Sequence, residues 1–312
     1  MRDTNSTLPQ MSEKIFLTDG GLETVMIFHE GLELPCFAAF DLLKDDSGTK
    51  TLRKYYRAFI ESALEGRMGF ILDTPTWRAS SDWMPQLGYP VHEVDRFNRK
   101  AVALMQELRQ EFQTADTPMV ISGAIGPRGD GYVPGVQMTV DEACDYHLPQ
   151  ARALAEGGAD LLSAVTMNYI AEAIGIVRAA KQVGLPIAIG FTTELDGHLP
   201  DGDTLEEAIN RVDRETEVEP AYYMVNCAHF DHFRDALIDG ADWVTRIRAV
   251  RANASRLSHA ELDECDVLDD GDPQEFGELC ADLHSRFPGL TVFGGCCGTD
   301  HRHVEAVRCA MQ

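Results

Sequence analysis

The sequence predicts a single (β/α)₈ barrel, and two observations carry the prediction. Eight short apolar segments, rich in β-branched residues, alternate with eight longer segments of helical periodicity, which is the pattern of repeated βαβ units and a parallel sheet. The length of 312 residues suits one barrel, which usually takes roughly 250 residues, with some additions. A doubly wound open sheet can show the same alternation, but eight complete units with none left over favour closure.

The first half of the chain predicts four strand–helix units. Apolar runs that end at glycine, proline or polar residues predict strands at Ile15–Thr18, Gly69–Asp73, Met119–Gly123 and Leu161–Val165. Helical spacing of apolar residues predicts helices at Leu52–Glu65, His92–Phe112, Thr139–Glu156 and Ile170–Gln182. Thr139 and Glu142 have the spacing of a capping box, and Gly157-Gly158 is a helix stop signal.

The second half predicts four more units. The expected strands are Pro186–Phe191, Tyr222–Asn226, Trp243–Ile247 and Thr291–Gly294, and the expected helices are Leu205–Val212, Phe230–Ile238, Pro273–Arg286 and Arg302–Cys309. Thr204 is the expected cap of the fifth helix, and a long acidic loop follows the seventh strand. We therefore expect one domain over residues 14–312, a loose tail over residues 1–13, and an active site at the carboxyl ends of the strands.

Composition excludes several classes of partner. The chain has 51 acidic and 27 basic residues, a formal net charge of −24, so nucleic acid and anionic membrane surfaces would be repelled. It has no apolar run of about 18 residues that could span a bilayer, and its first ten residues lack a signal-peptide pattern. We expect a cytoplasmic protein, a monomer or small homo-oligomer, whose partners are small molecules and whose eight cysteines are kept reduced.

Three of the cysteines predict a zinc site. Cys296 and Cys297 lie between glycines directly after the last strand, where a sharp turn can aim both sulfurs at one point. Cys227 follows the sixth strand and supplies a third sulfur. Three protein ligands leave a fourth position open, which is typical of catalytic zinc. Buried free cysteines are the alternative. We interpret the other five cysteines as structural or incidental: Cys36, Cys144, Cys265, Cys280 and Cys309. His229 and His232 lie nearby as weaker candidate ligands.

Polar and aromatic residues at other strand ends are candidates for substrate binding. Asp19, in Asp19-Gly20-Gly21, could accept hydrogen bonds from an ammonium group while the glycine amides hold a carboxylate; a cap or turn role is equally compatible. Glu23 lies in the same loop, and Thr74 could bind a carboxylate. Aromatic rings suit cationic methyl donors, and we place Trp77 ahead of Trp83 and Tyr132 because it lies closest to a strand end. Each ring could equally be an ordinary loop anchor.

Three segments resemble the signature segments of the homocysteine S-methyltransferase family. They are Asp19-Gly20-Gly21-Leu22-Glu23-Thr24, Val225-Asn226-Cys227 and Gly294-Gly295-Cys296-Cys297-Gly298-Thr299. Weaker matches occur at Ser122–Pro127, at Phe191–Gly202 and at Asn253, so the resemblance extends from about Phe16 to Val307. The resemblance implies a barrel whose zinc ligands are Cys227, Cys296 and Cys297, with Asp19 at the amino acid's ammonium group and Gly20-Gly21 near its carboxylate. It also places Asn226 in the site.

One position departs from this pattern. The family usually carries a glutamate after the fourth strand that helps to bind the amino group of homocysteine, and here Val165 occupies that position. A valine cannot accept a hydrogen bond from an ammonium group, and burying the charge beside it is costly. Another acid compensates, for which Glu194 after the fifth strand is the candidate, or the acceptor is not homocysteine.

The sequence thus predicts a zinc-dependent S-methyltransferase. The donor would be a sulfonium, S-methylmethionine or S-adenosylmethionine, or a betaine-like compound, and the acceptor a zinc-bound thiolate, homocysteine giving methionine. Two alternatives remain open: the same chemistry on another thiol or selenol, and a non-catalytic barrel that binds zinc and thiols.

Overall fold

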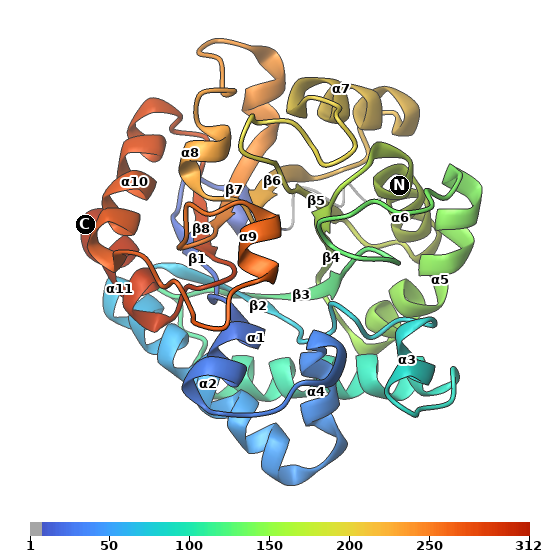
Figure 1. Cartoon of the computed structure of the whole chain (residues 1–312). Coiled ribbons are helices and arrows are strands. Elements are labelled where there is room, and N and C mark those ends of the chain that lie inside the picture. The colour runs from blue at the N-terminus through green and yellow to red at the C-terminus, as the bar shows by residue number, and fades with distance from the viewer. Residues whose placement is uncertain (1–7) are drawn as a thin grey trace.

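The chain folds as a closed barrel of eight parallel strands paired in sequence order from β1 to β8, with β8 returning to β1. In this computed structural model, which describes residues 8–312, helices surround the barrel and the chain travels once around its axis (Figure 1). The strands are β1 Phe16–Leu17, β2 Gly69–Asp73, β3 Met119–Ile125, β4 Leu161–Met167, β5 Ile187–Phe191, β6 Tyr222–Asn226, β7 Ile247–Ala252 and β8 Val292–Gly295. The predicted (β/α)₈ barrel is confirmed, and the open-sheet alternative is wrong because β1 and β8 pair.

The helices differ greatly in length. They are α1 Leu22–Thr24, α2 Asp46–Gly66, α3 Trp83–Gln86, α4 Glu93–Phe112, α5 Val140–Gly157, α6 Ile170–Val183, α7 Leu205–Thr216, α8 Phe230–Phe233, α9 His259–Asp263, α10 Pro273–Arg286 and α11 His301–Ala310. The capping box of Thr139 and Glu142 opens α5 as predicted, and Thr204 forms another with Glu207 on α7. In Figure 1 the short helix α9 lies in front of the barrel near β8, over its open end.

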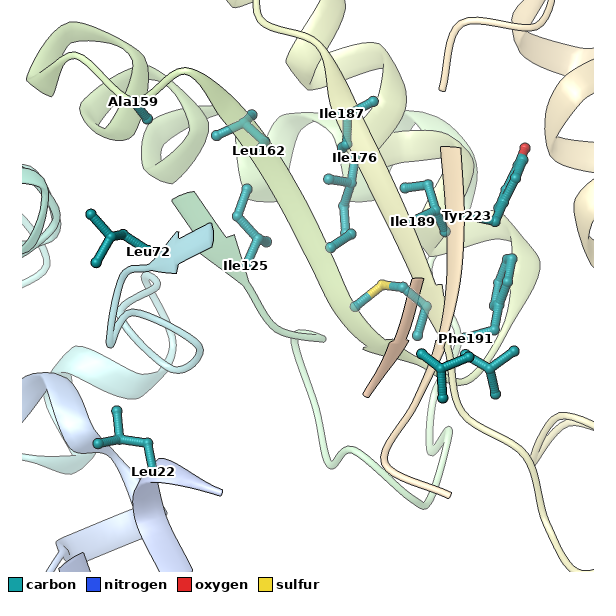
Figure 2. Packing of buried hydrophobic residues seen from close by; sticks show 14 of the residues in the cluster. Leu22, Leu72, Ile125, Ala159, Leu162, Ile176, Ile187, Ile189, Phe191 and Tyr223 are labelled. Carbon is teal, nitrogen blue, oxygen red and sulfur yellow. The ribbon is translucent and has the colours of Figure 1, made fainter. Parts of the chain in front are cut away.

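Two apolar layers hold the barrel. The larger lies between strands and helices; Figure 2 shows part of it, where Ile187 and Ile189 of β5 lie near Ile176 of α6. Phe191 of β5 and Tyr223 of β6 stack with ring centroids 6.2 Å apart. The second layer gathers one or two residues from every strand, as expected for a filled barrel interior. Its strand members are Phe16, Ile71, Val120, Leu161, Ala188, Tyr222, Met224, Ala249 and Val292.

The segment before β1 is not the expected loose tail where the structure describes it. Leu8 joins the interior layer, Gln10 is buried in a short 3-10 helix, Pro9–Met11, and the Arg248 guanidinium donates to the carbonyl of Ser12 at 3.0 Å. Residues 8–13 therefore close the amino end of the barrel. Residues 1–7 of the predicted tail lie outside the described residues.

Two predicted elements on the β6–β7 side are wrong in extent. The helix expected at Phe230–Ile238 stops at Phe233, and the Arg286 side chain binds the carbonyl of Leu237 at 2.8 Å in place of further helical hydrogen bonds. The strand expected at Trp243–Ile247 is a 3-10 helix, Asp242–Arg246, and β7 begins where the prediction ended. Asp213 anchors that helix through Arg246, with hydrogen bonds of 2.7 and 2.9 Å.

Candidate active site

The three predicted cysteines converge at the carboxyl end of the barrel. Each offers a sulfur, and the sulfurs of Cys227, Cys296 and Cys297 lie within 4.8 Å of one another. Among the residues that the structure describes, they form the one such group of potential metal ligands. We call these three residues the cysteine cluster.

Strand β7 explains why two distant segments meet. It lies between β6 and β8, and the backbone amides of Cys227 and Cys296 donate to consecutive β7 carbonyls, those of Arg251 at 3.0 Å and Ala252 at 2.8 Å. Cys227 leaves β6 with a left-handed φ of 58°, which is uncommon for a side chain of this kind. Gly298, with φ of +80°, lets the chain turn immediately after Cys297. The cluster is thus fixed by backbone geometry at two strand ends.

The geometry of the cluster fits a zinc ion. Sulfurs about 2.3 Å from a tetrahedral zinc lie roughly 3.8 Å from each other, and the sulfurs of Cys227 and Cys297 are 3.7 Å apart. That separation is far too long for a disulfide, and all three cysteines are free. Hydrogen bonds from Cys227 and Cys297 lower the pKa of Cys296 well below its usual range, and the Arg251 charge acts in the same direction. Three soft donors, one of them readily ionised, suit zinc.

Tyr132 covers the cluster from the β3–α5 loop. Its hydroxyl lies 3.2 Å from the sulfur of Cys227 and 3.6 Å from that of Cys297. Its ring stacks on the imidazole of His259, with centroids 3.9 Å apart and planes 8° from parallel. His259 in turn binds the carbonyl of Cys227 through Nε2 at 2.8 Å and Glu194 through Nδ1 at 3.0 Å. This arrangement gives α9 a role that the sequence did not predict, namely holding a phenol over two thiols.

A buried ion cluster lies beside the cysteines. The Arg251 guanidinium of β7 donates to Asp19 at 2.6 Å and to Asp73, at the end of β2, at 2.5 Å. Asp19 also accepts from the Tyr55 hydroxyl at 3.1 Å. We call Asp19, Asp73 and Arg251 the ion cluster. Burial raises the pKa values of both carboxyls, and the Arg251 charge opposes the shift.

Both clusters open into one cavity of about 470 Å³, a volume in the range of small-molecule sites. Of the residues predicted to bind substrate, six contribute to its wall. They are Asp19, Gly20, Gly21, Glu23, Thr74 and Trp77. Val165, the residue at the departing position, also lines it.

The other two predicted substrate residues do not line the cavity. Asn226, the last residue of β6, is fully buried and bonds to β4: its Oδ1 accepts from the Thr166 amide at 3.0 Å and its Nδ2 donates to the Thr166 hydroxyl at 2.9 Å. Glu194, the candidate to replace the missing acid, is bound to His259. Neither lies among the residues that form the cavity wall.

Several predicted contacts are already used within the protein. The Arg78 guanidinium makes cation–π contacts with two tryptophan rings. It lies 4.7 Å from the ring centroid of Trp77 and 4.0 Å from that of Trp83. The Thr74 hydroxyl bonds that of Thr76 at 2.6 Å. Gly21 packs so closely on the cysteine turn that a Cβ would lie 2.5 Å from the Cys296 carbonyl oxygen. Gly21 is therefore required for packing on the cysteine turn, whether or not it also contacts a substrate.

Arg251, Asp73 and His259 are site residues that sequence reasoning missed. The signal for Arg251 was a charged residue within an apolar strand, which requires a buried partner, but it was hidden because β7 was placed too early in the chain. Asp73 carried a weaker signal, an acid as the last residue of a correctly predicted strand. His259 gave none, because it lies in a long acidic loop.

Comparisons with known proteins identify the family of this chain. Residues 16–311 match the sequence profile of the homocysteine S-methyltransferase family. The chain belongs to this family. Homocysteine S-methyltransferase YbgG of Bacillus subtilis (strain 168) is 23% identical over 247 residues, which cover 75% of this chain and 76% of that protein. Homocysteine S-methyltransferase 1 of Arabidopsis thaliana is 20% identical, with 93% of this chain and 91% of that protein covered.

Solved structures show the same fold. The oxidized form of the homocysteine methyltransferase MmuM from Escherichia coli has a TM-score of 0.77 at 18% identity, covering 99% of both chains. Its metallated form has a TM-score of 0.75, also at 18% identity, covering 98% of this chain and 99% of that one. As a member of the family, the chain is a homocysteine S-methyltransferase-like enzyme. No helix in residues 8–312 has the length and apolar character needed to cross a membrane.

Proposed function

We propose that the protein is a zinc-dependent S-methyltransferase that moves a methyl group from a sulfonium or betaine-like donor to homocysteine. The observation that carries the proposal is the convergence of three sulfurs from two strand ends onto the wall of one cavity. Cys227, Cys296 and Cys297 would hold the metal. A zinc ion in that position stabilises the thiolate form of the acceptor at neutral pH.

The chain's own residues would align the two substrates. The acceptor sulfur attacks the methyl carbon, a new carbon–sulfur bond forms, and the bond from that carbon to the donor's sulfur or nitrogen breaks, so that the donor leaves without its positive charge. Correct orientation of the reacting atoms supplies much of the rate in such a step. Tyr132 and α9 close one side of the cysteine cluster, and the glycine turn at Gly21 packs on the other. Both limit access of water to the reacting thiol.

A second candidate is the same chemistry on a different thiol or selenol. It is favoured by the ion cluster, because both oxygens of Asp19, the acid expected to meet the substrate ammonium, are engaged by Arg251 and Tyr55. The wall at Val165 is apolar. A screen of acceptors with and without an amino group separates the two candidates.

Zinc content tests the proposal most directly. We expect about one zinc per chain in the reduced wild-type protein, loss of zinc in Cys297→Ser, and loss of methyl transfer with it. Cys309→Ser is the matched control, because Cys309 is an exposed cysteine on α11, and it should keep both properties. A folded wild type that fails to take up added zinc would refute the mechanism. S-methylmethionine, S-adenosylmethionine and betaine should then be compared as donors.

A further inference from the structure

The charges on the cavity wall indicate how an amino acid acceptor would be held. A buried ammonium group needs a carboxylate partner, because an unpaired charge away from water is costly. Six acids line the cavity: Asp19, Glu23, Asp73, Asp130, Asp263 and Asp269. Their existing hydrogen bonds decide which of them is free to receive a substrate.

The ion cluster uses two of these acids. Asp19 holds Arg251 with one oxygen and Tyr55 with the other. Asp73 holds Arg251 through Oδ2. One guanidinium is thus shared by two carboxyls, and Asp73 Oδ1 has no hydrogen-bond partner among the described residues. Recruiting either acid for substrate would still weaken a buried ion pair.

Three more acids lie toward the mouth of the cavity. Asp130 accepts from the amides of Tyr132 and Val133 at 2.8 and 3.1 Å, which shapes the covering loop. Asp269 accepts from the Ser255 hydroxyl at 2.6 Å. Asp263, the last residue of α9, is exposed. Water competes strongly for an ammonium group at an exposed position, so that contact would contribute little.

Glu23 is the remaining acid. Its carboxylate is bonded only to its own backbone amide and to no other residue among residues 8–312. It belongs to the short helix α1, whose neighbouring residue Thr24 accepts from the amide of Gly298 at 3.2 Å and donates to the carbonyl of Gly21 at 2.9 Å. These bonds hold α1 against the cysteine turn, and the charge of Cys296 is close enough to influence Glu23.

A positive group lies on the same side of the cavity. Arg78 lines the wall, is mostly buried, and has an Nε without a hydrogen-bond partner. Arg78 and Glu23 influence each other's charge state. A carboxylate that is bonded to no other described residue and a guanidinium with a spare donor suit a zwitterion, whose ammonium and carboxylate groups need opposite partners.

We propose that Glu23 binds the ammonium group of the acceptor and so makes this enzyme selective for an α-amino thiol. The inference rests on the proposed function and deepens it, since it assigns to Glu23 the task that neither Val165 nor the occupied Asp19 performs. Glu23 acts on binding rather than on the transfer step. It differs from the candidate Glu194, which contacts His259 instead of the cavity.

The test compares homocysteine with its desamino analogue, 4-sulfanylbutanoate, on the zinc-loaded protein. Glu23→Gln should lower kcat/KM for homocysteine about ten- to a hundredfold, mainly through KM, because a charge-assisted hydrogen bond is lost. The analogue has no ammonium group, so its kcat/KM should change less than about threefold. Glu33→Gln is the charge-matched control, because Glu33 is exposed and outside the cavity wall, and it should leave both substrates unaffected.

A second variant tests the assignment by moving the carboxylate. Val165 lines the same cavity, so Glu23→Gln combined with Val165→Glu should recover part of the preference for homocysteine. Zinc content is measured in every variant, because a general disturbance of the cysteine turn would lower it. An equal loss on both thiols, or no loss on either, would overturn the role of Glu23.

Direct thiol binding, measured by calorimetry without donor, separates this inference from the proposed function. Selective homocysteine binding that disappears in Glu23→Gln, in a protein that transfers no methyl group, would support Glu23 and refute the methyltransferase. Normal methyl transfer with unchanged selectivity in Glu23→Gln would refute only the inference. A zinc-loaded wild type that binds neither thiol would refute both.

Discussion

The cysteine cluster and the ion cluster lie on the wall of the same cavity, but they are built in opposite ways. The cysteine cluster comes from two strand ends, and its geometry is set by backbone features: the left-handed φ of Cys227 and the amide bonds to β7. The ion cluster comes from β2, β7 and the turn after β1, and its geometry is set by the ion pairs of one guanidinium with two carboxyls.

The two clusters should therefore contribute differently to function and to stability. Free thiols tolerate burial well, since cysteine behaves as a small apolar residue, so the fold does not depend on the metal that the cysteines would bind. Two carboxylates and a guanidinium in the same surroundings are stable only as a set. We therefore expect the cysteines to be dispensable for folding and the ion cluster to be indispensable.

The largest effect should follow loss of the charge at the centre of the ion cluster. Arg251→Met leaves Asp19 and Asp73 buried beside each other without a cation, which should lower the free energy of unfolding by about 3–5 kcal/mol. Urea denaturation at pH 7 measures it. Arg178→Met is the control, because Arg178 pairs with Asp141 at an exposed site, and it should lose about 1 kcal/mol or less.

The same experiment has a compensating variant. Arg251→Met combined with Asp19→Asn and Asp73→Asn removes all three charges together, so most of the lost stability should return. A single Arg251→Met variant that loses less than about 1 kcal/mol would contradict the distinction between the clusters. So would a triple variant that stays as unstable as the single one.

A smaller effect is expected behind the cysteine cluster. Asn226→Ala removes both bonds to Thr166, leaves that buried amide without its partner, and should cost about 2 kcal/mol. It also removes the support next to Cys227, so zinc affinity should fall about tenfold, measured by competition with a chelator. Asn98→Ala is matched, since Asn98 is equally buried and donates to two carbonyls. It should lose similar stability while keeping zinc affinity, and equal affinity in both variants would refute a positioning role for Asn226.

Features set by local sequence patterns were predicted well, and features set by side-chain partners far apart in the sequence were not. Apolar runs identified seven strands within a few residues, because burial on both faces imposes continuous hydrophobicity. β7 was misplaced because it carries Arg248 and Arg251, whose partners lie far away in the sequence. The capping box at Thr139 and the cap at Thr204 were local signals, and both helices start where those signals predicted.

The site residues also fall into a group that local motifs predict and a group that depends on contacts across the barrel. Cys296-Cys297 between glycines is a local motif, and its meeting with Cys227 follows from the order of strands in a barrel. The engagement of Asp19 by Arg251 depends on side-chain geometry across the barrel, which no local pattern reports. The contact between Glu194 and His259 required knowing that the loop after β7 contains α9.

The smallest predicted effect concerns Glu23, which belongs to neither cluster. Burial raises its pKa to about 7, and the Cys296 charge adds to the shift. Because this acid titrates near 4.3 in the unfolded chain, the folded ligand-free protein binds the proton more tightly. Its contribution to stability is therefore present at pH 4.5 and is lost as pH rises to about 7.

Glu23→Gln should remove the loss of stability that wild type shows as pH rises, because glutamine does not ionise. We expect the variant to match wild type at pH 4 and to exceed it by about 1–2 kcal/mol at pH 8, after a discount for water in the cavity. Thermal unfolding at both pH values measures the difference, and Glu33→Gln should change neither. A Glu23→Gln variant that is less stable than wild type at pH 8 would show that the carboxylate has a partner in the folded protein. If Glu23→Gln is more stable than wild type at pH 8, the Glu23 carboxylate destabilises the ligand-free protein. Such a cost is expected of a residue whose function is to bind a charged ligand.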